Sequence, residues 1–318
     1  MIANIFLDNL TSETVPALKL DPSRCLKMRF AGSSCSCCTA ICLAEAIDLA
    51  GGLQVRKEQC TGCLACTTVC PAGAIETHED FGAILAVLAG HRSPVFVIGC
   101  ETTASRSHKQ LPCLGMLSPE HLVALYATGW AAINLAVDAC RGCGAGSMLE
   151  HLGTRLIDAE RSTGIPLSRR IRLVHSQETG FRQEGLDRRS FFSSLRRAAF
   201  QGVAQVLVPG RTEKPSATYM DKALPSRRAM LLAAIDSLPA DEAATARAAF
   251  TFSASFNDSC DGCLGCVRAC PTGALAESDT ASPSFDWSRC TGCMLCTEFC
   301  LYNALDITPL HCRHAISG

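Results

Sequence analysis

The pattern of apolar and polar residues predicts alternating strands and helices in the middle of the chain. Three short apolar runs, at residues 94–99, 131–137 and 170–174, are typical of buried strands. Helical segments lie between them, at 118–129 and 147–164. This alternation predicts a central α/β domain with a parallel sheet. In such a sheet, ligand sites lie beyond the carboxyl ends of the strands.

Both helical segments have start signals. Ser118 precedes Pro119, and proline is favoured at the first helical position. Ser147 and Glu150 have the spacing of a capping box, and Gly164 follows as a stop signal. These signals set the bounds that we expect for the two helices.

The two ends of the chain are organised by cysteine. The spacing C-x2-C-x2-C-x3-C, which ligates cubane [4Fe–4S] clusters, occurs three times unchanged. A fourth run is stretched, with nine residues between its first two cysteines. The runs are Cys25, Cys35, Cys38 and Cys42; Cys60, Cys63, Cys66 and Cys70; Cys260, Cys263, Cys266 and Cys270; and Cys290, Cys293, Cys296 and Cys300.

The spacing also predicts how the ligands are shared. The fourth cysteine of such a run ligates the other cluster of a pair, so the four runs predict four [4Fe–4S] clusters in two pairs. Glycines before the second cysteine, at 62, 262 and 292, keep bulk away from each cluster. The predicted ligand sets are Cys25, Cys35, Cys38 and Cys70; Cys42, Cys60, Cys63 and Cys66; Cys260, Cys263, Cys266 and Cys300; and Cys270, Cys290, Cys293 and Cys296.

Two other uses of cysteine are disfavoured. Zinc sites also use paired C-x2-C motifs, but a tetrahedral site needs no third or fourth cysteine at these spacings. A disulfide framework is disfavoured because the N-terminus has no secretory signal. The longest apolar stretch, 81–100, is interrupted by polar residues and too short to span a bilayer. We therefore expect a soluble, cytoplasmic protein without a transmembrane segment.

Both ends resemble the two-cluster bacterial ferredoxins. The resemblance rests on EQCTGCLACTTVCPAGAIE, DSCDGCLGCVRACPTGALAE and SRCTGCMLCTEFCLYNALDI, and it implies an α+β ferredoxin-like module at each end. Cys42 and Cys300 depart from the pattern because leucine replaces the proline that usually follows the fourth cysteine. We expect modules at 1–78 and 256–318, the central domain at 79–205, and a basic linker with one helix at 206–255.

A fifth cluster is predicted in the central domain. Cys100 ends the first predicted strand, Cys113 follows it, and Cys140 and Cys143 come after the second strand. Parallel strands end at one edge of a sheet, so these four cysteines are candidate ligands of one cluster. The alternative is that Cys100 and Cys113 are buried core thiols.

The central domain resembles the small iron–sulfur delta subunit of methanogen hydrogenases. The resemblance rests on LPCLGML, GWAAINLAVDACRGC and RIRLVHSQETGF. It implies a link between hydrogenase and heterodisulfide reductase, a setting in anaerobic metabolism, and a [2Fe–2S] cluster on the four central cysteines. No second cysteine follows Cys100 closely, and Cys140 and Cys143 are closer in sequence than in that family, so [2Fe–2S] is preferred over [4Fe–4S] only narrowly.

The remaining candidate residues have weaker signals. Of the 22 cysteines, Cys37 and Cys312 remain without a set. Cys37 is an alternative ligand or a bystander, and Cys312 belongs to a polar tail. His121 and His151 are expected at helix surfaces. The net charge is −1, yet residues 160–230 carry 14 Lys or Arg and six Asp or Glu. Such a stretch is either a solvated face or a surface that docks on an acidic protein, and the lack of a known binding motif disfavours nucleic acid.

These features predict an electron-transfer subunit of a cytoplasmic oxidoreductase complex. It relays electrons between a catalytic redox subunit and a second electron carrier, in a hetero-oligomer, and it has no catalytic residues of its own. The alternative is an enzyme, a heterodisulfide-type reductase with catalysis at the central cluster. A redox sensor is disfavoured because a sensor rarely needs five clusters.

Overall fold

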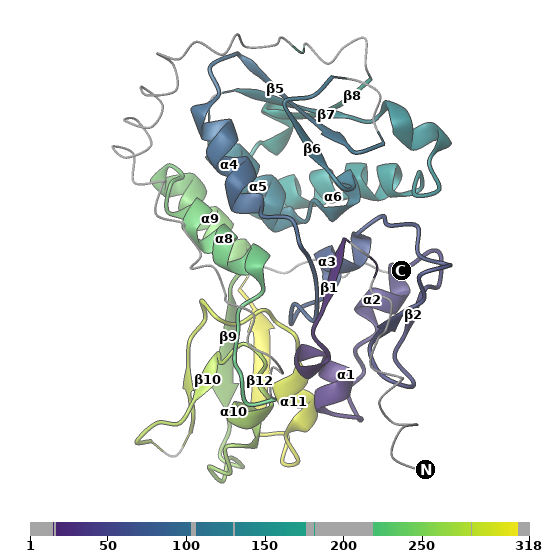
Figure 1. Cartoon of the computed structure of the whole chain (residues 1–318). Coiled ribbons are helices and arrows are strands. Elements are labelled where there is room, and N and C mark those ends of the chain that lie inside the picture. Colours follow the sequence, from purple (N-terminus) through teal and green to yellow (C-terminus); the bar gives the residue numbers. More distant parts are fainter. Residues whose placement is uncertain are drawn as a thin grey trace, which may run out of the picture.

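The computed structural model describes residues 15, 17–102, 106–129, 131–175, 181, 219–280 and 282–310. In Figure 1 a sheet with its helices forms one half of the molecule, and two cysteine-rich modules lie side by side in the other half. Residues 160–230, expected to be basic, are largely outside the described residues, and so is Cys312.

The sheet confirms the predicted parallel arrangement. Its strand order is β6-β5-β7-β8, and every neighbouring pair is parallel. Phe96, Ile98, Ile133 and Leu135 of the two middle strands are buried in the core. The short strand β6 was not predicted, because only one of its three residues is apolar. The strands are β5 (Val95–Cys100), β6 (Lys109–Leu111), β7 (Ala132–Ala136) and β8 (Ile171–Val174).

Helices flank this sheet, and two of them were predicted. Helix α5 begins after Ser118, whose hydroxyl accepts the backbone N–H of His121 at 3.3 Å. Helix α6 ends at Gly164, where φ is +68°. The capping box expected at Ser147 and Glu150 is wrong: Ser147 already has helical backbone angles and makes no side-chain cap bond. The helices are α4 (Phe81–Gly90), α5 (Pro119–Ala127) and α6 (Met148–Thr163).

The surface position expected for His121 is also wrong. Only 7 % of His121 is exposed, and its ring packs edge-on against Phe81 at 4.3 Å between centroids. Its Nδ1 accepts the backbone N–H of Ser118 at 3.2 Å, which requires the neutral ring and completes a capping box. Burial lowers the pKa of His121 to about 4. His151, in contrast, is half-buried.

A buried neutral histidine makes stability depend on pH. Between pH 6.5 and 4 the unfolded chain binds a proton at His121 that the folded chain does not, so stability falls as the pH is lowered. Gln at this position keeps a capping-box acceptor but does not titrate. From pH 7 to pH 5.5 we expect the unfolding free energy of the wild type to fall by about 1 kcal/mol more than that of His121→Gln. Anaerobic denaturant unfolding at both pH values measures this, and parallel curves would contradict it.

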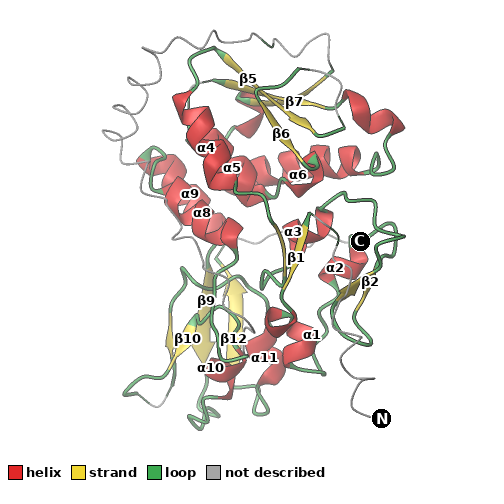
Figure 2. Ribbon diagram, in the orientation of Figure 1, coloured by secondary structure: helices red, strands yellow, loops and turns green. Residues whose placement is uncertain are grey.

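Each cysteine-rich module consists of short helices and small antiparallel sheets (Figure 2). In the N-terminal module, β1 pairs with β4 and β2 with β3; in the C-terminal module, β9 pairs with β12 and β10 with β11. The N-terminal elements are β1 (Leu18–Leu20), α1 (Leu26–Arg29), α2 (Cys37–Ala40), β2 (Ile47–Asp48), β3 (Gln54–Val55), α3 (Ala65–Val69) and β4 (Ile75–Thr77). The C-terminal elements are β9 (Phe252–Phe256), α10 (Gly265–Ala269), β10 (Leu275–Ala276), β11 (Ser284–Phe285), α11 (Leu295–Phe299) and β12 (Leu305–Pro309).

The stretch expected to be a linker with one helix instead contains two packed helices. These are α8 (Ser226–Ile235) and α9 (Ala240–Ala249). Helix α8 packs against α5 and α9 against α6, and Met230, Leu231 and Ile235 are buried in the same core as the sheet. Among the described residues, no helix is both long and apolar enough to cross a membrane.

Candidate metal centres

The cysteine runs share an unusual backbone conformation. In each unchanged run the glycine before the second cysteine has a positive φ, between +65° and +71°. The residue after the second cysteine is left-handed too, at Leu64, Leu264 and Met294, although side chains disfavour that region. Glycine therefore suits these positions because it adopts a positive φ easily, in addition to leaving space beside the cluster. In the run of Cys60, Cys63 and Cys66, the three cysteines of this backbone turn line one cavity.

The fourth cysteines share a second feature, and here the stretched run follows the pattern. Each of their Sγ atoms accepts the backbone N–H of an alanine four residues later, at 3.2–3.3 Å. Such bonds stabilise a thiolate and the negative charge of a reduced cluster. The pairs are Cys42 with Ala46, Cys70 with Ala74, Cys270 with Ala274, and Cys300 with Ala304.

Two cysteine sets of the N-terminal module each surround a cavity. One cavity, of about 20 Å³, also has Leu53 and Ile75 in its wall, and the other is about 260 Å³. The wall of each cavity contains the first three cysteines of one run and the fourth cysteine of the other run. We name them the inner N-terminal set (Cys25, Cys35, Cys38 and Cys70) and the outer N-terminal set (Cys42, Cys60, Cys63 and Cys66).

The four central cysteines also converge. They line a cavity of about 70 Å³ at the carboxyl edge of the sheet and form the central set: Cys100, Cys113, Cys140 and Cys143. Cys100 is the last residue of β5, Cys113 follows β6, and the other two lie in and after the 3-10 helix Asp138–Gly142. Burial raises the pKa of Cys113 to about 12, and the nearby Cys63 and Cys100 add to the rise.

In the C-terminal module, neighbouring cysteines affect one another's pKa values. Burial raises the pKa of Cys293 to about 12, with Cys270 and Cys290 adding to the rise. Burial also raises the pKa of Cys266, with contributions from Cys263 and Cys260. We name the inner C-terminal set (Cys270, Cys290, Cys293 and Cys296) and the outer C-terminal set (Cys260, Cys263, Cys266 and Cys300).

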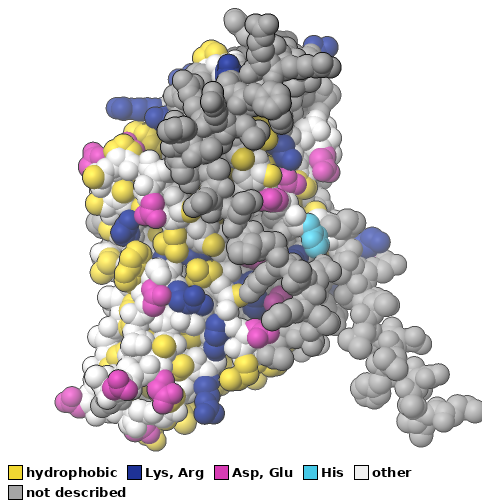
Figure 3. Space-filling view, turned by 60° about the vertical axis from the view of Figure 1, so that its left-hand side comes forward, with side chains coloured by type: hydrophobic (Ala, Val, Ile, Leu, Met, Phe, Trp, Pro, Cys, Tyr) yellow, Lys and Arg dark blue, Asp and Glu magenta, His cyan; other side chains and the backbone are white. Residues whose placement is uncertain are grey.

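The outer C-terminal set lies near an exposed and acidic surface. Cys263 is exposed, and 91 % of Leu301, which follows Cys300, is exposed. Residues 252–310 carry seven Asp or Glu and two Arg. In the view of Figure 3, acidic side chains (magenta) lie at the lower end of the molecule, where the C-terminal module lies. Such a surface favours a positively charged partner.

One cysteine outside the sets lies close to a set. Cys37 is exposed and stands at the wall of the inner N-terminal cavity. A hydrogen bond with the Cys35 thiol lowers the pKa of Cys37 to about 7. Within the described ranges, no group of three His, Cys, Asp or Glu side chains is arranged to hold a single metal ion.

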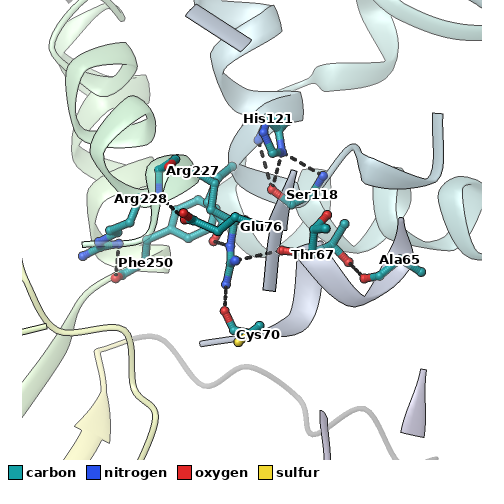
Figure 4. A network of polar contacts seen from close by, with 12 residues as sticks. Ala65, Thr67, Cys70, Glu76, Ser118, His121, Arg227, Arg228 and Phe250 are labelled. Atoms are coloured by element: carbon teal, nitrogen blue, oxygen red, sulfur yellow. Dashed lines mark hydrogen bonds and ion pairs between the residues drawn. The ribbon is translucent and has the colours of Figure 1, made fainter. Parts of the chain in front are cut away.

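A buried arginine ties the inner N-terminal set to the helices of the central domain. Arg227 of α8 donates to the backbone oxygens of Thr67, at 2.9 Å, and Cys70, at 2.6 Å (Figure 4). It also pairs with Glu120 of α5, at 3.2 Å between Nε and Oε1. Burial acts to raise the pKa of Glu120, but the positive charge of Arg227 helps to hold this pKa below its usual value. In the sequence, Arg227 stands out only as one of the basic residues of the stretch 160–230.

The cysteine sets and their surroundings suit iron–sulfur clusters, and comparisons with known proteins agree. Residues 255–301 match the 4Fe-4S dicluster domain, and residues 53–76 match the 4Fe-4S binding domain. The chain therefore has two 4Fe–4S ferredoxin-type domains, which confirms the iron–sulfur character predicted for both ends. These matches support a role in electron transfer.

A curated relative has a short similar stretch. Over 49 residues the chain is 35% identical to pyruvate synthase subunit PorD of Methanocaldococcus jannaschii. The matched stretch makes up 15% of this chain and 57% of that protein. The chain thus spans less than two thirds of the length of this relative. No solved structure matches the chain. The resemblance of the central domain to the delta subunit stays a prediction.

Proposed function

We propose that this chain is a multi-cluster electron-transfer subunit of a larger oxidoreductase complex. It relays electrons between a catalytic partner and a second electron carrier. The observation that carries the proposal is the convergence of three complete cysteine sets around separate cavities, two in the N-terminal module and one in the central domain. The cytoplasmic location expected from the sequence stays a prediction.

The donor sets suit iron–sulfur clusters. Each consists of cysteines, and iron–sulfur clusters are held by cysteine thiolates. The four sets of the two end modules would hold [4Fe–4S] clusters, and the central set would hold a further cluster, for which [2Fe–2S] is preferred over [4Fe–4S]. Such clusters accept and release single electrons. The chain's own contribution is to orient the thiolates, exclude water and donate N–H groups to sulfur, which shifts reduction potentials.

The position of Cys37 favours a relay over an enzyme. A heterodisulfide-type reductase with catalysis at the central cluster needs a reactive thiol or an open iron beside that cluster. Cys37, the described cysteine outside the five sets, lies instead at the inner N-terminal set. The matched relative is named as a subunit of pyruvate synthase, which supports a place for this chain in a complex of several subunits.

Metal analysis tests the proposal directly. Four cubanes and a [2Fe–2S] cluster contain about 18 iron atoms, and five cubanes contain about 20. We expect anaerobically purified or reconstituted protein to bind this amount of iron with matching acid-labile sulfide. Iron below half of that amount together with stoichiometric zinc would refute the iron–sulfur assignment, because zinc binds thiolates without sulfide.

A further inference from the structure

The central set directly adjoins the outer N-terminal set. Thr61 and Gly62 of the N-terminal module line the central cavity, while Gly144, Ala145 and Met148 of the central domain line the outer N-terminal cavity. The backbones nearly touch at Gly115, where an added Cβ would lie 2.2 Å from the carbonyl oxygen of Cys63. The central set therefore lies against one ferredoxin module rather than between the two.

Within each module the two sets are joined by short helices. Cys38 lies in α2 and Cys42 follows its end, and likewise Cys66 lies in α3 and Cys70 directly follows its last residue. Four residues of helix rise by about 6 Å, so the two sets are neighbours. The C-terminal module repeats this arrangement: Cys266 lies in α10 and Cys270 directly follows it, Cys296 lies in α11 and Cys300 directly follows it, and the two helices pack together.

The two modules meet at their inner sets. Leu26, Ala72 and Leu295 form a small buried cluster, and Cys35 and Cys293 pack against it. Phe30 and Phe299 stack edge-on beside it at 5.2 Å between centroids. An inner N-terminal cysteine and an inner C-terminal cysteine thus pack against the same small apolar cluster.

Two residues of this contact, Leu26 and Phe30, belong to the stretch that lengthens the first cysteine run. Nine residues, 26–34, separate Cys25 from Cys35. Besides Leu26 and Phe30, this stretch contributes Arg29, which donates to the carbonyl oxygen of Ala269 at 3.5 Å, and Ser34, whose backbone N–H donates to Glu298 at 3.1 Å. A standard run has only two residues here. We name residues 26–34 the bridging insert.

We propose that electrons pass in single file from the central set through the outer N-terminal, inner N-terminal and inner C-terminal sets to the outer C-terminal set, or in reverse, across a junction built by the bridging insert. This order rests on the proposed function. Each step oxidises one cluster by one electron and reduces its neighbour by one. Redox proteins at the two ends supply and accept the electrons, one beside the central set and the other at the exposed Cys263.

Magnetic coupling between reduced clusters reports which of them are neighbours. In the reduced, reconstituted protein we expect Cys293→Ala to remove the inner C-terminal signal from the low-temperature EPR spectrum. The same change should narrow the inner N-terminal and outer C-terminal signals and leave the central signal unaltered. Cys140→Ala should remove the central signal and narrow that of the outer N-terminal cluster alone. A central signal that responds to Cys293→Ala would overturn the order.

A second variant keeps every ligand. Replacing residues 26–34 by two residues restores the standard spacing between Cys25 and Cys35. We expect unchanged iron content and loss of the coupling between the two inner clusters. Persistent coupling in this variant would refute the role of the bridging insert. A protein that binds zinc without sulfide would instead refute the proposed function, so the two failures are distinguishable.

Discussion

Replacing Cys70 with alanine is expected to damage the cluster of the inner N-terminal set and to spare the cluster held by the rest of its own run. Cys70 shares a cavity with Cys25, Cys35 and Cys38, although it follows Cys66 by four residues. Its backbone oxygen is fixed by Arg227 and its Sγ by the N–H of Ala74. These bonds hold Cys70 in the wall of the cavity that it shares with the other run, so we expect its thiolate to ligate the cluster there.

The matched control is Cys42→Ala. Cys42 is the fourth cysteine of the stretched run, and it has the same N–H···S bond, to Ala46. It lines the cavity of Cys60, Cys63 and Cys66, so this variant should lose the outer N-terminal cluster instead. EPR of the reduced proteins and iron counts separate the two outcomes. If Cys70→Ala and Cys42→Ala each lost the cluster of their own run, the exchange of ligands would be disproved.

The cysteines that line each cavity of the N-terminal module could be grouped from the sequence because metal chemistry restricts the spacing of a cubane run. The spacing of a cubane run varies little, and its fourth cysteine ligates the other cluster of a pair, so the unchanged runs alone predict the partner of each fourth cysteine. The convergence of the central set followed from a different rule, that parallel strands end at one edge of a sheet. Cys100, Cys113, Cys140 and Cys143 meet there although β6, which places Cys113, was not foreseen.

Tertiary packing decided what the sequence left open. A linker was expected at 206–255, but its Pro225 and Pro239 each directly precede a helix, α8 or α9, as proline can at a helix start. Those helices are stable because the faces of α5 and α6 cover them, a contact that local pattern does not encode. The bridging insert is a similar case. Its length could be read from the sequence, but its contact with the C-terminal module could not, because the contacting residues lie more than 200 positions away.

The prediction with the largest expected effect on stability concerns Arg227. Its guanidinium joins three elements, since it donates to the end of α3 at Thr67 and Cys70 and pairs with Glu120 of α5 from α8. Side chains of this pair are only 9% and 16% exposed. Removing one partner of a buried ion pair leaves an uncompensated charge, which costs about 3–5 kcal/mol. For Arg227→Met we expect the anaerobic thermal midpoint to fall by roughly 10 °C.

Two further variants make this prediction specific to the buried charge. Arg247→Met on the adjacent helix α9 removes a pair with Asp236 whose side chains are 47% and 74% exposed, and such a pair contributes about 0–1 kcal/mol. The double change of Arg227→Met and Glu120→Leu should recover part of the lost stability, because it removes the stranded carboxylate. Equal thermal midpoints for Arg227→Met and Arg247→Met would show that the buried interactions of Arg227 with Thr67, Cys70 and Glu120 do not stabilise the fold. A double variant no more stable than Arg227→Met would place the loss in the hydrogen bonds to Thr67 and Cys70 instead.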